Sequence, residues 1–405
     1  MKNTTIILLV FVTIFCGSVL AQEKKADQTD PYVVSRVSGP VTLDGMSDEP
    51  AWEGIESLPL RMRTPIYDNE PSERTEFLLG YDDDYIYAAG RFHYSELSEI
   101  QAASFKRDFW HWSSDFMGIT LDTFNDNENG VVFLITPAGT RTDANILNDA
   151  AGAPYKNINT SWNTFWDVAS VCNDDGWFTE MRIPFSSLRF EEKDGQVVMG
   201  LAAFRWISSK NESDTFPLIP QKFGSFGQYM PSQTQEVLFE GIKSHNPLYI
   251  TPYLLGGSGQ SNELNDAKTA YKRDDELAHE AGLDVKYGLT NNLTLDVTLN
   301  TDFAQVEADN QQINLTRYSL FFPEKRLFFQ ERSGNFDFRF EDDNRLFYSR
   351  RIGLHEGEQV RIYGGARLVG RAGPWDIGFL NMQTERFKEL TSENFNVLRL
   401  RKQVI

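Results

Sequence analysis

The sequence predicts an all-β fold, in which an N-terminal β-sandwich is followed by the antiparallel strands of a partial transmembrane β-barrel. Three observations lead to this prediction. Short β-prone runs alternate with acidic or Asn/Gly-rich turns from residue 31 to about residue 240. From residue 245, longer runs alternate apolar with polar side chains, as strands with one apolar face do. After residue 21, no segment of the sequence is as long and apolar as a membrane-spanning helix.

The first 21 residues have the features of a cleavable signal peptide. Lys2 supplies a positive charge, an apolar run extends from Ile6 to Phe15, and a small residue, Ala21, stands at the expected cleavage point. At roughly ten residues, the apolar run is too short to cross a bilayer comfortably. We therefore expect cleavage after Ala21, export to the cell envelope, and a short flexible leader over residues 22–30. The alternative is a retained N-terminal anchor.

The composition excludes several classes of function. The formal net charge is -19, and nucleic-acid binding needs clustered Lys and Arg, so no nucleic-acid partner is expected. Once the signal peptide is removed, Cys172 is the one remaining cysteine, so neither an intramolecular disulfide nor a cysteine-based metal cluster can form. The five histidines are scattered without metal-ligand spacing. An exported chain without disulfides suits a bacterial envelope better than a secreted eukaryotic domain.

Strand pairs separated by turns justify the predicted sandwich. The clearest pair surrounds the acidic turn Asp82-Asp83-Asp84, which is the pattern of a β-hairpin. Many short strands with regular turn signals favour a β-sandwich, here in one domain of ordinary size. The expected pairs are 75–81 with 85–92, 116–122 with 131–136, and 168–171 with 177–183.

Five short elements of the N-terminal part occur in a fixed order. They are 41–45 with 48–52 (VTLDG, DEPAW), 76–91 around YDDDYIY, 112–122 from WSSD to LD, 137–139 (PAG) and 176–185 (GWFTEMRIPF). Together they resemble carbohydrate-binding module family 9 over about residues 31–240. This resemblance implies a β-sandwich that binds a polysaccharide or oligosaccharide. Because such modules are attached to glycoside hydrolases, it also implies a role in carbohydrate catabolism or uptake.

Several aromatic residues of this part are candidates for sugar binding. A sugar ring is bound by aromatic rings that stack on its apolar face and by polar groups that take its hydroxyls. Trp110, Trp112, Trp162 and Trp166 lie in polar, loop-like stretches, and Asp115 lies near the first two. In the resembled family two tryptophans clamp the terminal sugar, and Trp112 and Trp162 match those positions best. The alternative is that these side chains pack beneath the loops.

The resemblance also implies calcium binding. Hard cations take oxygen ligands, and the candidates here are Asp82, Asp83, Asp84, Asp122 and Asp126. Their spacing matches no fixed calcium loop, and acidic turns are commonly just solvated turns. Calcium therefore stands as a cofactor expected from the type of ligand alone.

An enzymatic function, as a glycoside hydrolase, is the alternative to binding. Hydrolysis of a glycosidic bond needs two carboxylates that flank it. Glu180 is a candidate on an expected strand, but the sequence identifies no partner for it. The sequence also contains no nucleophile elbow, zinc-protease helix motif or phosphate-binding loop. No catalytic residue is therefore assigned.

The C-terminal part contains about six expected strands. The first is Leu248–Leu255, and alternating apolar residues mark four others clearly. Such strands fit a transmembrane β-barrel, whose outer side is apolar, and equally a second soluble antiparallel sheet. Periodicity alone leaves both readings open. The four alternating runs are 283–289, 293–299, 362–368 and 375–379.

Several segments of this part carry a second resemblance. They are 301–309 (TDFAQVEAD), 314–316 (NLT), 321–331 (FFPEKRLFFQE), 347–353 (FYSRRIG) and 364–368 (GGARL). They resemble an uncharacterised family of outer-membrane proteins that carry such a module in front of a barrel. We therefore expect residues 245–405 to be a partial outer-membrane barrel domain. Bacterial barrels have at least about eight strands, so the sequence is expected to be a piece of a longer protein.

The segment 321–331 is unusual because charged residues stand between pairs of phenylalanines. Glu324, Lys325, Arg326 and Glu331 are its charged members. Inside a barrel such groups belong in the lumen or in a plug, where they pair with one another rather than face lipid. In a soluble protein the same segment would be a loop that caps the sheet.

Overall fold

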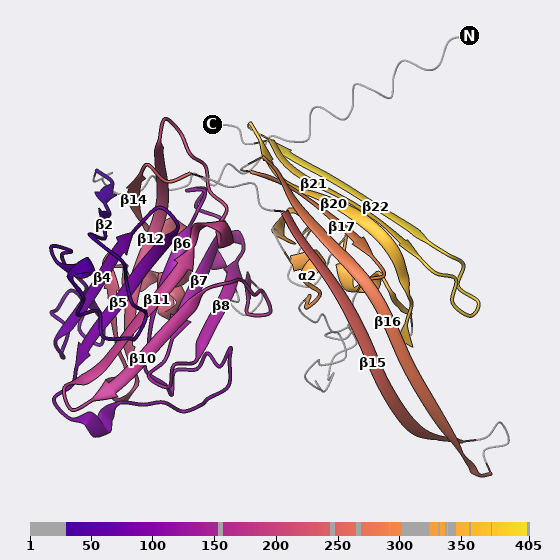
Figure 1. Cartoon of the computed structure of the whole chain (residues 1–405), viewed down its shortest axis with the longest axis horizontal. Helices are drawn as coiled ribbons and strands as arrows, with labels where there is room; N and C mark the ends of the chain where they lie inside the picture. Colours follow the sequence, from indigo (N-terminus) through magenta and orange to yellow (C-terminus); the bar gives the residue numbers. More distant parts are fainter. Residues whose placement is uncertain are drawn as a thin grey trace, which may run out of the picture. The chain divides into compact units, whose positions relative to one another are not determined.

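The computed structural model describes most of the chain. The described residues are 30–152, 157–243, 248–264, 269–290, 292–301, 324–330, 333–336, 338, 346–355, 358–373 and 375–402. Strands and short 3-10 helices dominate them, in agreement with the predicted all-β class (Figure 1). The expected signal peptide and nearly all of the expected leader lie outside the described residues.

The N-terminal part consists of two sheets. The first has the order β10 (Asp167–Asn173), β11 (Gly176–Pro184), β5 (Tyr85–His93), β4 (Thr75–Tyr81) and β2 (Ser35–Arg36). The second has the order β1 (Tyr32–Val33), β14 (Gln235–Glu240), β12 (Gln196–Ile207), β6 (Phe116–Asp122), β7 (Gly130–Ile135), β8 (Arg141–Ile146) and β9 (Ile158–Asn159). Strand β13 (Glu212–Phe216) pairs with β12 and with β3 (Arg61–Thr64).

Short 3-10 helices occupy several connections between these strands. They are η1 (Pro50–Trp52), η2 (Leu97–Glu99), η3 (Asn148–Ala150), η4 (Phe185–Ser187), η5 (Ser208–Lys210), η6 (Gln221–Tyr229) and η7 (Pro231–Gln233).

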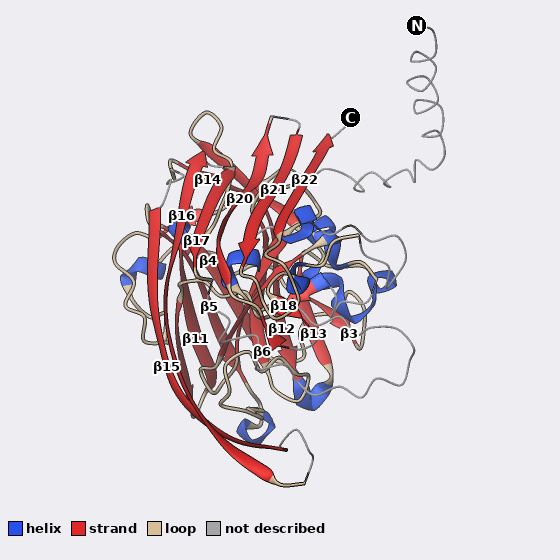
Figure 2. Ribbon diagram, turned by 90° about the vertical axis from the view of Figure 1, so that its right-hand side faces the viewer, coloured by secondary structure: helices blue, strands red, loops and turns tan. Residues whose placement is uncertain are grey.

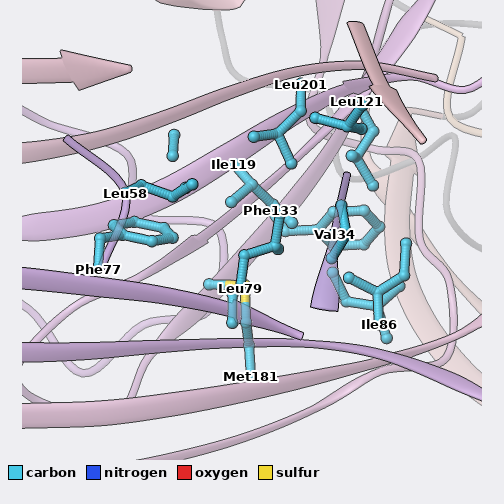
Figure 3. Close-up of a cluster of buried hydrophobic side chains, with 14 of the residues drawn as sticks. Val34, Leu58, Phe77, Leu79, Ile86, Ile119, Leu121, Phe133, Met181 and Leu201 are labelled. Atoms are coloured by element: carbon cyan, nitrogen blue, oxygen red, sulfur yellow. The ribbon is translucent and has the colours of Figure 1, made fainter. Parts of the chain in front are cut away.

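The two sheets pack face to face over one hydrophobic core. Side chains that alternate along β4, such as Phe77 and Leu79, meet Ile119 and Leu121 of β6 and Phe133 of β7 (Figure 3). All five are almost completely buried. Because every second residue of a strand points to the same face, this alternation produces the two-layer sandwich. The predicted sandwich and its three strand pairs are therefore confirmed within a residue or two at each end.

The buried carboxylate of Glu180 holds residues 44–52 against the outer face of the five-stranded sheet. Glu180 lies on β11 and has no exposed surface. Its Oε2 accepts hydrogen bonds from the backbone N–H groups of Asp44 (3.1 Å) and Gly45 (2.9 Å), and its Oε1 accepts one from Nε1 of Trp52 (3.1 Å). Burial raises the pKa of Glu180 to about 7, against the effect of these donors. Two of the five sequence elements, 41–52 and 176–185, therefore meet at one side chain.

The C-terminal part is a six-stranded antiparallel sheet (Figure 2). Its order is β15 (Leu248–Leu264), β16 (Tyr271–Thr290), β17 (Leu293–Leu299), β20 (Ile362–Ala372), β21 (Trp375–Thr384) and β22 (Asn394–Lys402). The other described elements here are α2 (Leu327–Gln330), η9 (Ser333–Phe336), η10 (Ser349–Arg351), β18 (Leu354–His355) and β19 (Glu358–Gln359). In the described residues, no helix is long and apolar enough to cross a membrane.

The two faces of this sheet differ in how far they are covered. One face carries apolar side chains in neighbouring register, such as Val285 opposite Val297 and Leu368 opposite Phe379. Many of its large apolar residues are exposed. The other face carries polar groups that are buried, including an ion pair between Arg367 Nη2 and Asp296 Oδ2 at 2.9 Å. The same face also buries apolar side chains, among them Leu380 and Met382, which belong to one cluster with Phe328 and Phe329.

Part of the chain between β17 and β20 lies against the buried face of the sheet. The ring of Phe328 lies 5.5 Å from the guanidinium of Arg367, and Asn335 Nδ2 donates to the backbone oxygen of Ile377 at 3.1 Å. Arg326 pairs with Glu324 at 2.8 Å within the same segment. This pairing fits both expectations for the segment, charges on the inner side of a barrel and a loop that caps a soluble sheet.

Replacing Glu180 by Ala should destabilise the sandwich by about 3 kcal/mol, because three buried N–H groups lose their acceptor. The control is Asp174→Ala, in the exposed turn between β10 and β11, which should change the stability by less than about 0.5 kcal/mol. Urea unfolding of both variants measures the difference. Equal stabilities would contradict the role assigned to Glu180.

Candidate functional site

The connection from β5 to β6 contains a long loop, residues 101–115, that is closed at its base. Asp115 Oδ2 accepts hydrogen bonds from Tyr94 Oη (2.6 Å) and from the backbone of Gln101 (3.2 Å). Its Oδ1 accepts from the backbone N–H of Ser208 at 2.7 Å. The backbone N–H of Asp115 in turn donates to the backbone oxygen of Gln101 at 2.8 Å. The two ends of the loop are therefore held together.

The middle of the same loop is attached to β8 and to the segment before β10. Arg107 donates to the carboxylate of Asp143 on β8 and, at 2.8 Å, to Oδ1 of Asn163. The backbone N–H of Thr164 donates to Asp143 Oδ2 at 2.7 Å. Asp143 is fully buried, and this burial raises its pKa. Because a buried carboxylate is costly without partners, these contacts favour one conformation of both segments.

Exposed aromatic rings stand close in sequence to these polar contacts. Phe105, two residues before Arg107, is 86% exposed, and Phe165, two residues after Asn163, is 75% exposed. Trp162 is half-buried, with its ring 6.3 Å from that of Phe133. We define Phe105, Arg107, Trp162, Asn163 and Phe165 as the loop surface. It combines apolar rings with polar side chains, which are the two kinds of group that a sugar ring requires.

The structure does not bring Trp112 and Trp162 together as the two walls of one clamp. Trp112 packs on Trp206 (4.9 Å) and Phe116 (5.7 Å), which lie on the outer face of the nine-stranded sheet. Trp162 packs on Phe133, which points to the inner face of that sheet. The clamp expected from the resemblance is therefore wrong for this pair, because its members pack against opposite faces.

Trp110 and Trp166 have structural surroundings. Trp110 is half-buried against Tyr229, with ring centroids 4.7 Å apart, on the same outer face as Trp112. Trp166 is only 2% exposed and packs on Phe133 at 5.1 Å. The prediction that Trp166 stacks on a sugar is wrong, because its ring is covered by protein.

Asp115 is likewise not available to a ligand. It is fully buried, and both of its carboxylate oxygens accept hydrogen bonds from the protein. Its prediction as a sugar contact is therefore wrong. Instead, Asp115 positions the loop that carries Phe105 and Arg107.

The first group of predicted calcium ligands shapes a hairpin turn. Asp82 Oδ1 accepts from the backbone N–H groups of Asp84 (2.8 Å) and Tyr85 (2.7 Å), and Oδ2 accepts from Tyr87 Oη (2.8 Å). Asp83 is exposed and pairs with Arg36 at 2.8 Å. These contacts are those of a hydrogen-bonded turn between β4 and β5.

The second group is also engaged with its own backbone. Asp122 accepts from the N–H groups of Asp126 (3.1 Å) and Asn127 (2.7 Å), and Asp126 accepts from that of Glu128 (2.9 Å). Burial, together with the nearby carboxylate of Asp126, raises the pKa of Asp122 to about 7. Across the described ranges, no group of three or more His, Cys, Asp or Glu side chains is arranged to hold a metal. Calcium binding stays a prediction without an assembled ligand set.

Sequence reasoning did not identify Phe105, Arg107 or Phe165. The available signal was a phenylalanine next to polar or charged residues in an expected loop, as in Phe105-Lys106-Arg107. The prediction favoured tryptophans, because two tryptophans clamp the sugar in the resembled family. Exposure decides whether a ring can stack on a ligand, and a loop sequence alone does not give it.

The chain was compared with family models, solved structures and curated proteins. The family model "Domain of unknown function (DUF5916)" matches residues 248–368. A carbohydrate binding module family 9 from Caldicellulosiruptor kristjanssonii, in complex with cellotriose, has 17% identity over 53% of this chain and 95% of its own, with a TM-score of 0.36. A candidate carbohydrate-binding protein from Bacteroides uniformis has 13% identity over 52% of this chain and 99% of its own, with a TM-score of 0.41. No curated protein matches the chain.

Replacing Asp115 by Ala should destabilise the sandwich by about 2–3 kcal/mol, because the Tyr94 hydroxyl and two backbone N–H groups lose their acceptor. Amide hydrogen exchange at Gln101 and Ser208 should become faster. Glu96→Ala, an exposed acid just before the same loop, serves as the control. Unchanged exchange at both amides would contradict the closure of the loop by Asp115.

Proposed function

We propose that this protein is a carbohydrate-binding module of the bacterial cell envelope, anchored in the outer membrane, with a role in the breakdown or uptake of carbohydrate. The observation that carries the binding part of the proposal is the loop surface. Two largely exposed phenylalanines, Phe105 and Phe165, lie two residues along the chain from Arg107 and Asn163, which are joined by a hydrogen bond. Bare rings of this kind are costly in water unless a ligand covers them.

The fixed conformation of the loop surface favours binding. Arg107 joins the loop 101–115 to Asp143 and Asn163, and Asp115 closes the loop at its base. A ligand therefore meets groups that are already ordered, so less conformational entropy is lost on binding. In this arrangement the phenylalanine rings stack on the apolar face of a sugar, and polar groups next to them take its hydroxyls.

Binding is favoured over hydrolysis because the candidate acid is buried. Glu180 has no exposed surface and accepts three hydrogen bonds from the protein framework. A catalytic carboxylate must reach the glycosidic oxygen or the anomeric carbon of its substrate. Glu180 is therefore a structural residue in this proposal.

The anchoring part of the proposal rests on the C-terminal sheet. Its apolar face extends across all six strands, for example at Ile250 on β15, Leu299 on β17 and Leu400 on β22, which are all more than half exposed. Strands of 9 to 11 residues, such as β20, β21 and β22, have the length that crosses a bilayer when tilted. We propose that this face contacts lipid hydrocarbon and that the sheet is a sector of an outer-membrane β-barrel.

The sugar-binding role predicts that Phe105→Ala and Phe165→Ala each weaken glycan binding by up to about tenfold, since a stacked ring contributes about 0.5–1.5 kcal/mol. The control is Tyr67→Ala. It removes an aromatic ring that is 43% exposed, in the loop after β3 and outside the loop surface, and should leave binding unchanged. A glycan array followed by affinity electrophoresis of residues 31–240 measures these effects. Absence of binding to any plant or microbial glycan would contradict the proposal.

The lipid-facing role predicts that Val297→Arg, in the middle of the apolar face, lowers the stability of the membrane-inserted sheet by about 2–4 kcal/mol. The control Asn262→Arg adds the same charge near the exposed tip of the β15–β16 hairpin. Urea extraction of the membrane fraction should release Val297→Arg far more readily. Equal release of both variants and the wild type would argue against lipid contact at Val297.

A further inference from the structure

The two ends of the C-terminal sheet differ in how its strands are connected. At one end, residues 291–292 join β16 to β17, and residues 373–374 join β20 to β21. At the other end, residues 265–270, 300–361 and 385–393 connect the strands. We name these the short-turn end and the long-loop end. Because the sheet is antiparallel throughout, each connection belongs unambiguously to one end.

The long-loop end also carries a polar extension. Strands β15 and β16 remain paired as far as Leu264 and Tyr271. Beyond Leu255 the sequence of β15 is mostly glycine and polar residues, and residues 272–276 of β16 are Lys-Arg-Asp-Asp-Glu. Since successive strand residues belong to opposite faces, neither face of this stretch suits hydrocarbon. The hairpin therefore projects beyond the apolar band at the long-loop end.

In bacterial outer membranes, the lengths of the connections between strands indicate which end of a barrel faces the periplasm. Barrels there have short turns on the periplasmic side and longer loops on the extracellular side. We propose that the short-turn end of the sheet faces the periplasm and that the sandwich lies on that side, with the β15–β16 hairpin at the cell surface. This inference rests on the lipid contact proposed above and adds its direction.

The length of the connecting chain places the sandwich on the same side. The last strand of the sandwich, β14, ends at Glu240, and β15 begins at Leu248. Leu248 pairs with Tyr287, close to the turn between β16 and β17, so the chain enters the sheet at its short-turn end. The stretch 241–247 spans at most about 25 Å even when fully extended. A bilayer with its headgroups is about 40–45 Å thick, so this stretch does not cross it.

The location has a consequence for the ligand. A sandwich in the periplasm does not meet an insoluble polymer outside the cell, whereas oligosaccharides small enough to cross the outer membrane reach it. The ligand class assigned to the loop surface is therefore a soluble oligosaccharide rather than an insoluble polymer outside the cell. Exposed rings such as Phe105 and Phe165 suit a short chain, because each ring stacks on a single sugar unit.

The chain carries its own reporter for this inference. Cys172 is an exposed free thiol on β10 of the sandwich. In intact cells that express the full chain, a polyethylene-glycol maleimide too large for outer-membrane pores should leave Cys172 unmodified. Permeabilisation of the outer membrane should expose it. In a Cys172→Ser background, Asn262→Cys near the hairpin tip should react in intact cells, and Lys402→Cys at the short-turn end should react only after permeabilisation.

The opposite pattern, with Cys172 modified and Asn262→Cys protected in intact cells, would overturn the direction while leaving the lipid contact in place. Recovery of the chain in the soluble periplasmic fraction would overturn the lipid contact itself. Fractionation of the same cells separates these two failures. Detection of each variant at wild-type levels in the membrane fraction ensures that protection reflects location rather than loss of protein.

Discussion

The polarity of the sheet faces is the constraint on which both parts of this protein depend. In the sandwich, apolar faces meet each other, and residues such as Phe77 and Phe133 lose all contact with water. In the C-terminal sheet, one face exposes large apolar residues such as Leu400, whereas the other buries the ion pair of Asp296 and Arg367 together with apolar residues such as Leu380. A sheet of the first kind is complete once its two layers pack, whereas the exposed apolar face of the second is covered, in our proposal, by lipid hydrocarbon.

Within the sandwich, buried carboxylates hold the segments that lack regular secondary structure in place. Glu180 holds the residues around Gly45 and Trp52, and Asp115 and Asp143 hold the loop 101–115. Each of these acids is fully buried and accepts hydrogen bonds from segments distant in sequence. Segments without regular secondary structure gain fixed positions in this way, because their backbone N–H groups find acceptors. The exposed rings of the loop surface depend on this framework for their placement.

Much of the fold could be predicted from the sequence, because strand periodicity and turn residues are local properties. The hairpin around Asp82 and the apolar alternation of β17 are examples. The site was predicted less well. Trp112 and Trp162 follow one pattern in the sequence but pack on opposite faces of a sheet, and Asp115 looks like a surface acid but is buried. Which face of a sheet a loop folds over depends on long-range packing, and local sequence patterns do not indicate it.

Fluorescence quenching of Trp375 tests the central claim, that the apolar face of the C-terminal sheet contacts lipid. Trp375 begins β21 on this face and is 42% exposed. The emission of Trp375 is obtained by subtracting the fluorescence spectrum of Trp375→Phe from that of the wild type, with both proteins reconstituted in vesicles. Brominated phospholipids should quench this emission, and aqueous acrylamide should quench it only weakly. Strong quenching by acrylamide with no effect of brominated lipid would show that this face is in water rather than in lipid.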